Sequence, residues 1–532
     1  MRSRGRAAVP SGSPYDRRMA SKRVIVVGGG HNGLVAAILA AQDGHRVTLL
    51  EAGPKPGGAT VSERVFRGRP TRLSRYSYLV SLFPQDLADR LGITLELASR
   101  TVSSYTPVIR AGRSTGLLVE RQPGRATEDS FRELTGSGSE YRAWEQLYGE
   151  LAELAQAVAP LLSGPLPTRE QVRAAVVARA GGQIWTDLFE RPLGEMITRR
   201  FADDTVRGVV ATDGLIGTHT SLFDESLLAN RCFLYHLIGR GTGEWLVPVG
   251  GMGAVSAALL ERAERAGVQV TTGVEVVAAE EGPDGVRLTD ADGENWPADT
   301  VLAAVAPATV AGWLDRPARR PVGAQLKVNM LLDRLPRLAS GVDPELAFAG
   351  TTHLEEGFDA LEAAYRVSAA GGIPDPLPSE VYCHSLTDPS IMAGQPGATL
   401  TLFGLHAPDA LFRQDPDGAK AQALRAALDA VQRHLAEPLE DCLARDAEGE
   451  LCLDVATPVD LERTLRMPGG NIFHADLSWP WREPDEDDSA AARFGVRVPG
   501  ARRILQAGAG SRRGGGVSGL GGAAAVDALR GQ

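Results

Sequence analysis

Three glycines near the N-terminus have the spacing of a dinucleotide-binding turn. A β-branched run at 24–27 leads directly into Gly28, Gly30 and Gly33, and apolar residues at helical spacing follow. In such a strand–turn–helix unit the first glycine permits a tight turn, the second lets the backbone approach a pyrophosphate, and the third lets the helix pack closely on the strand. The N-terminus of the helix favours the phosphate charge. The pattern therefore predicts that this segment binds a dinucleotide.

An acidic residue stands where the second half of this unit needs one. A second predicted strand, at 46–50, ends in Glu51, which lies 18 residues after Gly33. A carboxylate at this distance can accept hydrogen bonds from the ribose hydroxyls, and its charge disfavours a 2′-phosphate. Three neighbouring residues complete the first part of the predicted cofactor site: His31, Asn32 and Ala52.

Paired glycines after the acid bear on which dinucleotide is bound. Gly57, Gly58 and Ala59 follow Glu51 closely, an extension typical of flavoproteins. On these residues the chain resembles the FAD-dependent amine oxidase and phytoene desaturase superfamily, in which an Arg-x-Gly-Gly element follows the acid. Lys55 replaces the usual arginine, which keeps the charge but loses the planar fork of donors. The resemblance implies FAD as the cofactor, with all three small residues in its site.

Further blocks resemble one branch of this superfamily, the phytoene dehydrogenase-like proteins, which include pyridine nucleotide-disulfide oxidoreductase domain-containing protein 2. Together the blocks cover nearly the whole chain after Ser21. The segment 511–513 departs from the branch, because Ser-Arg-Arg stands where Thr-His-Pro is more usual. The blocks are 29–34, 211–219, 250–255, 469–474 and 514–519.

A second glycine-rich turn closes the chain. A strand-like run begins at Ile504, and a helical run of small and apolar residues follows the glycines. The resemblance implies that this turn lies against the isoalloxazine ring, with a helix N-terminus facing the side that becomes negative on reduction. Arg512 or Arg513 either adds charge there or lies solvated on the surface. The resemblance adds four positions to the predicted cofactor site: Gly510, Gly516, Val517 and, at the adenine ring, the backbone of Val277.

The middle of the chain alternates helix and strand patterns. Apolar residues recur at helical spacing over 255–263, and short apolar runs follow within 268–277. The stretches 286–288 and 300–305 flank the dipeptide Asp292-Gly293, which is typical of tight turns, and this predicts a β-hairpin formed by the two stretches.

These patterns predict an α/β fold with a discontinuous Rossmann-type FAD-binding domain and an inserted α+β substrate domain. A chain of 532 residues is too long for one compact core. Met19 is an alternative start to Met1, and 1–21 is expected to be a flexible tail. We expect the FAD-binding domain to comprise 22–96, 242–313 and 465–532, and the substrate domain to comprise 97–241 and 314–464.

Composition excludes several classes of function. The net charge of −10 and the lack of a clustered basic face argue against a nucleic-acid partner. No apolar run is long enough to span a membrane, although peripheral contact with one stays possible. The cysteines have no C-x-x-C spacing, so neither a disulfide framework nor a metal site is expected, and a reducing, cytoplasmic location is favoured. The four cysteines are Cys232, Cys383, Cys442 and Cys452.

No catalytic constellation is visible in the inserted segments, so the catalytic residues stay unknown. Hydride can pass directly from a C–H bond to a flavin while the protein supplies position and electrostatics, so an acid–base pair is not required. His219 and His474 stand in family-like blocks, and a structural role is favoured for each. Trp479 and Trp481 are interpreted as packing residues, and the acidic run 485–488 as a solvated loop.

The resulting hypothesis is an FAD-dependent oxidoreductase, a dehydrogenase, desaturase or oxidase, that moves hydride from a C–H bond of a small or lipid-like organic substrate to flavin N5. The electron acceptor is left open, and no second G-x-G-x-x-G follows a strand to bind NAD(P)H. Two alternatives stay open. One is an isomerase that uses FAD without net redox, and the other is a non-catalytic escort-type protein of the same architecture that binds prenyl or lipid groups.

Overall fold

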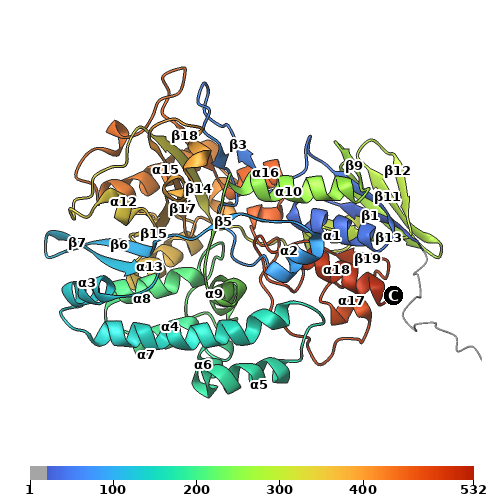
Figure 1. The fold of residues 1–532 in the computed structure, drawn as a ribbon, viewed down its shortest axis with the longest axis horizontal. Helices are drawn as coiled ribbons and strands as arrows, with labels where there is room; N and C mark the ends of the chain where they lie inside the picture. The colour runs from blue at the N-terminus through green and yellow to red at the C-terminus, as the bar shows by residue number, and fades with distance from the viewer. Residues whose placement is uncertain (1–20) are drawn as a thin grey trace, which may run out of the picture.

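The computed structural model describes residues 21–532, so the predicted tail at 1–21 lies outside the described residues except for Ser21. A five-stranded sheet, parallel throughout, forms the end of the molecule on the right of Figure 1. Its order is β19-β13-β1-β2-β9, so strands from distant parts of the chain lie side by side. The bounds are β1 Arg23–Val27, β2 Arg46–Glu51, β9 Gln269–Thr272, β13 Thr300–Ala303 and β19 Ile504–Gln506.

Both faces of this sheet are covered, which explains the β-branched run in β1. Val24 and Val26 pack on one face against three helices, whereas Ile25 and Val27 pack on the other against a three-stranded antiparallel sheet. Alternate residues of a strand face opposite sides, and a parallel sheet is usually buried on both. The covering elements are α1 His31–Gln42, α10 Met252–Arg265, α18 Leu520–Arg530, β10 Val276–Gly282, β11 Gly285–Asp290 and β12 Asn295–Ala298.

The predicted strand–helix–strand unit is confirmed as β1, α1 and β2, but the predicted hairpin is wrong in its second strand. β11 pairs with β12, whereas the stretch 300–305 contributes β13 to the five-stranded sheet. β12 holds Trp296 and Pro297 rather than a β-branched run, and it can contain a proline because it lies at the edge of its sheet. The local turn was therefore recognisable, and the partner strand was not.

A seven-stranded mixed sheet forms the opposite end of the molecule. Its order is β18-β14-β17-β16-β15-β6-β7, and only the β15–β6 pair is parallel. The helix α15, Pro416–Gln432, contributes four of its alanines and Val431 to the core of this sheet. The bounds are β6 Val102–Arg110, β7 Arg113–Glu120, β14 Leu326–Leu332, β15 Thr351–Leu354, β16 Ser379–Tyr382, β17 Ala398–Gly404 and β18 Leu453–Ala456.

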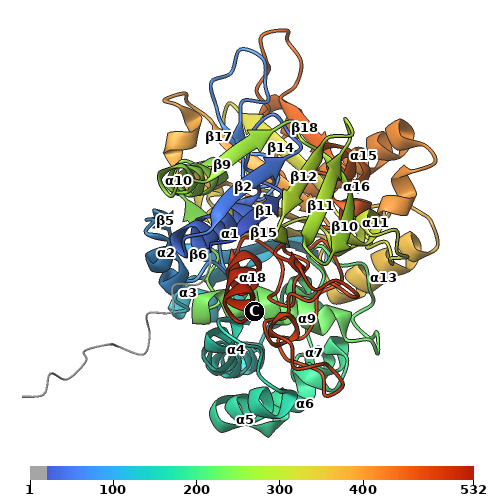
Figure 2. The ribbon, with the colours of Figure 1, turned by 90° about the vertical axis from the view of Figure 1, so that its right-hand side faces the viewer.

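A layer of helices lies along the lower side of the molecule in Figure 1, and Figure 2 shows the C-terminal helix α18 between this layer and α1. Leu520 of α18 belongs to the core of the helical layer, whereas the rest of its buried side chains belong to the core of the five-stranded sheet. The layer consists of α3 Arg125–Thr135, α4 Ser139–Val158, α5 Arg169–Ala180, α6 Gly182–Phe189, α7 Leu193–Arg200, α8 Asp204–Ala211 and α9 Leu228–Ile238.

Short elements connect these three parts. Across residues 21–532, none of the helices combines the length and the apolar character needed to cross a membrane. The connecting helices are α2 Gln85–Leu91, α11 Pro307–Trp313, α12 Pro344–Ala347, α13 Phe358–Ala369, α14 His384–Thr387, α16 Pro458–Leu465 and α17 Ala490–Arg493. The connecting strands are β3 Ser62–Glu63, β4 Leu73–Ser74, β5 Leu97–Ala98 and β8 Val247–Pro248.

The predicted α/β fold class is confirmed by this arrangement. The domain boundaries predicted from sequence stay a proposal, which is supported by the position of the five-stranded sheet. All of its strands fall within the three segments assigned to the FAD-binding domain, 22–96, 242–313 and 465–532.

Candidate functional site

The glycine turn after β1 has the geometry that its sequence predicts. Gly28 has a φ of +101°, a region in which only glycine is unstrained. A Cβ on Gly33 would lie 1.8 Å from the carbonyl oxygen of Gly28, so the helix approaches the strand as closely as only glycine allows. A Cβ on Gly30 would meet no atom within 4 Å. Gly28 and Gly33 therefore shape the turn, and Gly30 leaves open space in front of it.

The carboxylate of Glu51 lies at this turn. Its Oε2 accepts a hydrogen bond from the backbone N–H of Gly29 at 2.7 Å, and its Oε1 accepts one from Gly53 at 2.6 Å. Both bonds hold the carboxylate at the end of β2, with Ala52 between the acid and Gly53. The acid and the glycine turn are thus parts of one site.

The paired glycines come back to the same turn from the following loop. The backbone N–H of Gly57 donates to the carbonyl of Gly29 at 2.9 Å, and a Cβ on Gly58 would lie 3.1 Å from Cα of Gly30. Ala59 is fixed beside them, because its carbonyl accepts hydrogen bonds from the backbone N–H and hydroxyl of Ser77 at 3.1 and 2.7 Å. The loop therefore forms a second wall of the open space. We call this space the cradle; it is bounded by the turn at 28–33, by Glu51 and by the loop at 57–59.

Val277, predicted to meet an adenine ring through its backbone, lies at an irregularity of β10. The pairing with β11 runs from Val276 directly to Ala278 and skips Val277. Val277 is 47% exposed. The backbone of Val274, three residues earlier, donates to the carbonyl of Glu51 at 3.0 Å, so this segment lies beside the acid. The main chain at Val277 is thus left outside the ladder, near the cradle.

The N-terminal and C-terminal glycine turns meet around two histidines. The His31 ring lies 3.0 Å from the side-chain amide nitrogen of Asn32. Burial lowers the pKa of His31 to about 4, with a further contribution from nearby His474, and a backbone group of Gly516 acts in the opposite direction. Burial also lowers the pKa of His474 to about 4. Both rings are therefore neutral near pH 7.

Two buried polar atoms at this meeting point lack hydrogen-bond partners within residues 21–532: Oδ1 of Asn32 and Nδ1 of His474. Buried polar atoms are nearly always paired, so orphaned ones point to a group that belongs between them. Together with the open space at Gly30, they fit a bound dinucleotide that supplies polar atoms of its own.

The C-terminal turn combines open and packed positions. Gly516 has a φ of +76° and open space beside its Cα, whereas Val517 is buried in the core of the five-stranded sheet. Gly510 packs against Pro307, which a Cβ would approach to 2.4 Å. Gly522 lets α18 press on α1, since a Cβ there would lie 2.1 Å from the carbonyl of Asn32. The predicted helix after the glycines is therefore present, and its first turn packs on α1 beside Asn32.

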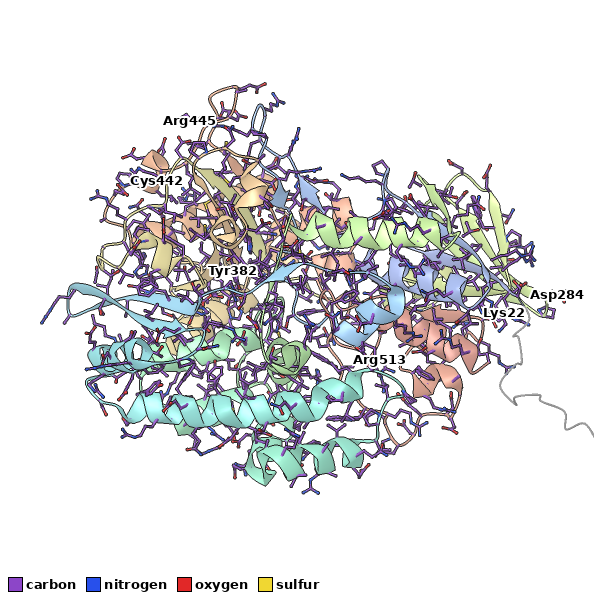
Figure 3. All side chains as sticks on the ribbon, viewed as in Figure 1. Lys22, Asp284, Tyr382, Cys442, Arg445 and Arg513 are labelled. Carbon is purple, nitrogen blue, oxygen red and sulfur yellow. The ribbon has the colours of Figure 1, made fainter. Side chains whose placement is uncertain are left out.

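The two arginines of this turn have different surroundings, and the expectation of a solvated surface residue is wrong for Arg513, which is buried. Arg512 pairs with Glu486 and donates to the carbonyl of Trp481 at 3.4 Å, so it fixes the acidic loop. Arg513 lies in the interior (Figure 3), and burial lowers its pKa to about 10. It ties the turn to the helical layer and to the loop after α17 by donating to three backbone carbonyls: Leu162, Gly164 and Phe494.

A cavity of about 500 Å³ lies between the helical layer and the seven-stranded sheet. Aromatic side chains make up much of its wall, including Tyr78, Trp144 and Tyr382. Such a volume is usual for a site that holds a small organic molecule. Two ionisable residues of its wall, Asp213 and Glu380, come from segments in which the sequence showed no catalytic pattern.

These two acids have raised pKa values. Burial raises the pKa of Asp213 to about 6. Burial and the neighbouring Glu356 together raise the pKa of Glu380 to about 8, although His353 acts in the opposite direction. The Tyr382 hydroxyl donates to Oε2 of Glu380. Asp213 lay within a family-like block, and this position was the one signal in the sequence that could have indicated it.

The cavity approaches the C-terminal turn across a single layer of side chains. His236 of α9 lines the cavity, and its ring centre lies 6.3 Å from that of Phe473. Phe473 in turn packs on Gly515, where a Cβ would lie 2.1 Å from its ring. Tyr235, the neighbour of His236, packs on Gly514 in the same way. The cavity and the cradle therefore share α9 and Phe473 as a common wall.

The remaining candidates from the sequence have structural surroundings. His219 is bonded to Ser368 through its Nε2 at 2.9 Å, and it does not line the cavity. Trp479 and Trp481 stack at 5.1 Å, and both pack against Phe189 in the helical layer, which confirms the packing interpretation.

A family model described as flavin containing amine oxidoreductase matches residues 33–332 of the chain. An uncharacterized protein of Mycobacterium tuberculosis is 44% identical over 514 residues, which are 94% of this chain and 95% of the relative. Pyridine nucleotide-disulfide oxidoreductase domain-containing protein 2 of Mus musculus is 28% identical over 507 residues, covering 85% of this chain and 84% of that protein.

Solved structures share the fold. A redesigned putrescine oxidase gives a TM-score of 0.55 at 17% identity, covering 96% of this chain and 99% of that one. Cyclohexylamine oxidase from Brevibacterium oxydans gives a TM-score of 0.53 at 17% identity with the same coverage. At this level of identity the likeness concerns the fold alone.

Proposed function

This chain belongs to the flavin-containing amine oxidoreductase family, with FAD as its cofactor, and on that premise we propose that it removes hydride from a C–H bond of an organic substrate held in the 500 Å³ cavity. The observation that carries the proposal is the common wall of α9 and Phe473, because a substrate in the cavity would lie next to the turn expected to hold the reactive ring. When bound, FAD accepts the hydride at N5.

We propose that FAD is held in two parts, with its ADP half in the cradle and its ring half at the C-terminal turn. Glu51 and the Gly28–Gly30–Gly33 turn would bind the ribose and pyrophosphate, and the backbone at Val277 would bind the adenine. The open space at Gly30 and the orphaned atoms of Asn32 and His474 support this assignment.

The C-terminal turn would hold the ring half. Gly516 leaves space beside the backbone, and α18 begins four residues later. A helix N-terminus favours negative charge, so α18 would stabilise the reduced state. His31 is neutral near pH 7 and can exchange hydrogen bonds there without adding a charge.

The substrate is proposed to be an organic molecule whose apolar part contacts the aromatic wall of the cavity. A lipid-like substrate is compatible with Trp144, Tyr148 and Trp245, while an amine, the kind of compound named for the solved oxidases, is compatible with Asp213. We also propose a reducing, cytoplasmic location, which is supported by four free thiols, all buried.

Anaerobic reduction of the purified yellow protein tests the function. Candidate amines, polyenes and lipids are added separately, and bleaching of the flavin absorbance is followed by stopped-flow. A substrate should bleach the wild type, whereas Val209→Trp, which fills the cavity, should retain FAD but bleach at least tenfold more slowly. Val177→Trp on the exposed face of α5 is the matched control and should behave as wild type.

The same experiment separates the alternatives. Conversion of a compound without any bleaching would indicate isomerase chemistry. A folded, colourless protein that cannot take up FAD would contradict the proposed redox function and favour an escort-type role.

A further inference from the structure

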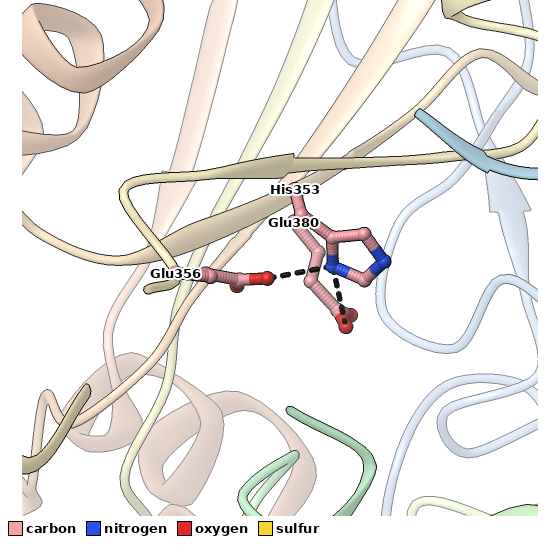
Figure 4. Close-up of side chains that lie close together, drawn as sticks. All are labelled: His353, Glu356 and Glu380. Carbon is pink, nitrogen blue, oxygen red and sulfur yellow. Dashed lines mark hydrogen bonds and ion pairs between the residues drawn. The ribbon is translucent and has the colours of Figure 1, made fainter. Parts of the chain in front are cut away.

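Three side chains at one wall of the cavity converge as potential metal ligands. His353 in β15 and Glu380 in β16 stand directly opposite each other in the strand register. Glu356 follows β15 by two residues, and Figure 4 shows its side chain directed at the His353 ring. The imidazole Nδ1 lies 2.6 Å from Oε2 of Glu356 and 3.8 Å from Oε1 of Glu380.

A single ion could join these three groups after small shifts of the side chains. One ligand atom from each residue lies within 4.8 Å of the other two. At bond lengths of about 2.1 Å and tetrahedral angles, two ligands of one zinc ion lie roughly 3.4 Å apart, so an ion would replace the hydrogen bond between His353 and Glu356, these two ligand atoms would separate slightly, and the Glu380 carboxylate would move slightly inward. His353 and Glu380 also line the cavity, which leaves room for a further ligand such as water.

No arginine or lysine among residues 21–532 forms an ion pair with the two glutamates of this wall. Within that range, Glu356 and Glu380 both have His353 as their one ion-pair partner. Arg100 also lines the cavity, but its guanidinium donates to the hydroxyl of Thr351 at 3.2 Å. Buried carboxylates are costly unless they are paired or coordinate a metal.

An orphaned oxygen points independently to a missing ligand. Oε1 of Glu356 belongs to a side chain with 0% exposure, yet it has no hydrogen-bond partner among the described residues. Glu380, by contrast, is oriented by the hydroxyl of Tyr382, as outer groups commonly orient metal ligands. We propose that His353, Glu356 and Glu380 bind one divalent transition-metal ion, Zn²⁺ or Mn²⁺, at this wall of the cavity.

Metal content of the FAD-loaded protein tests the proposal. The protein is stripped with a chelator, incubated separately with Zn²⁺ and Mn²⁺, desalted, and analysed by inductively coupled plasma mass spectrometry. The wild type should retain one ion per chain. His353→Asn and Glu380→Gln should each weaken binding by roughly 100-fold, and Tyr382→Phe by roughly tenfold to 100-fold. Flavin absorbance and circular dichroism verify that the variants fold.

Glu244→Gln is the matched control, because Glu244 also lines the cavity but is paired with Arg121 at 3.2 Å. It should retain the ion. The proposal is overturned if the wild type retains neither metal, or if His353→Asn and Glu380→Gln retain as much as the wild type. A third outcome would also overturn the proposal: the protein binds putrescine but no metal, and putrescine binding is lost in Glu380→Gln but kept in His353→Asn. The carboxylates would then recognise a cationic substrate.

Discussion

The cradle and the cavity share α9 and Phe473 as a wall, yet they are built from different kinds of group. The cradle is formed largely by backbone, with glycines that leave space and one carboxylate held by two backbone N–H groups. The cavity is lined by side chains that come from the helical layer and from the seven-stranded sheet. Backbone recognition needs a local turn, whereas side-chain recognition needs tertiary packing. Variants in the two regions should therefore fail in different ways.

The largest expected effect distinguishes Gly33, which allows the helix to pack on the strand, from Gly30, which leaves room for the cofactor. Gly33→Ala would place its Cβ 1.8 Å from the carbonyl of Gly28, and should lower the free energy of unfolding of the apoprotein by about 4 kcal/mol or more. Gly30→Ala meets no protein atom and has a φ of −70°, which alanine adopts readily. It should leave apoprotein stability unchanged but weaken FAD binding. Urea unfolding and FAD titration measure the two effects, and equal stabilities of the two variants would contradict this account.

A second prediction concerns the link between the two regions. Arg513→Met removes the donors for one buried and two partly buried carbonyls, and should lower the free energy of unfolding by about 2 to 4 kcal/mol because those oxygens lose their hydrogen bonds. Arg512→Met is the control, since Arg512 is partly exposed and should cost less. Thermal unfolding of both variants distinguishes them. A larger loss for Arg512→Met would show that Arg513 does not hold the turn in place.

A third prediction sharpens the role of the single acid of the cradle. Glu51→Ala should weaken FAD binding by about 1.5 to 3 kcal/mol, the scale of hydrogen bonds to a charged group. Glu51→Gln keeps the shape and should lose less. Titration of the apoprotein with FAD, followed by fluorescence quenching, measures both, and unchanged affinity in Glu51→Ala would exclude this residue as the ribose ligand.

The smallest expected effect concerns NADH and NADPH, which should not reduce the flavin rapidly. Within residues 21–532 one parallel sheet carries a dinucleotide-type turn, and the four cysteines are free thiols. Neither NADH nor NADPH should therefore bleach the flavin rapidly. Anaerobic mixing followed by absorbance checks this, and fast bleaching by either would indicate that the cavity or another surface accepts a nicotinamide.

The cradle could be predicted from the sequence because most of the residues that form it lie close together in the chain. The run 24–27, the glycines after it and the helical spacing of α1 are contiguous, so periodicity and turn chemistry were sufficient. The same reasoning misassigned 300–305, whose partner β1 lies far away in the sequence. Arg513 was also misread, because burial of an arginine against carbonyls depends on segments near 162 and 494.

The metal-ligand set was not predicted for a related reason. His353 and Glu380 become neighbours only through the register of β15 and β16, which tertiary packing sets. The spacing of His353 and Glu356, three residues apart, was visible but is common without function. The pair becomes a candidate metal site only when the fold brings Glu380, which is distant in the sequence, beside it.

The order of strands in the parallel sheet has a consequence for biosynthesis. β1 ends at Val27, while β19 begins at Ile504, and α18, which packs on α1, follows later still. At translation rates of about 5 to 20 residues per second, roughly 25 to 95 s pass after β1 is made before the last strand of its sheet is made. Throughout that interval the side of α1 that packs on α18 has no cover from its own chain. The nascent protein is thus exposed to aggregation and to chaperone binding until β19 and α18 have been made, and its folding rate is limited by contacts between segments that lie far apart in the sequence.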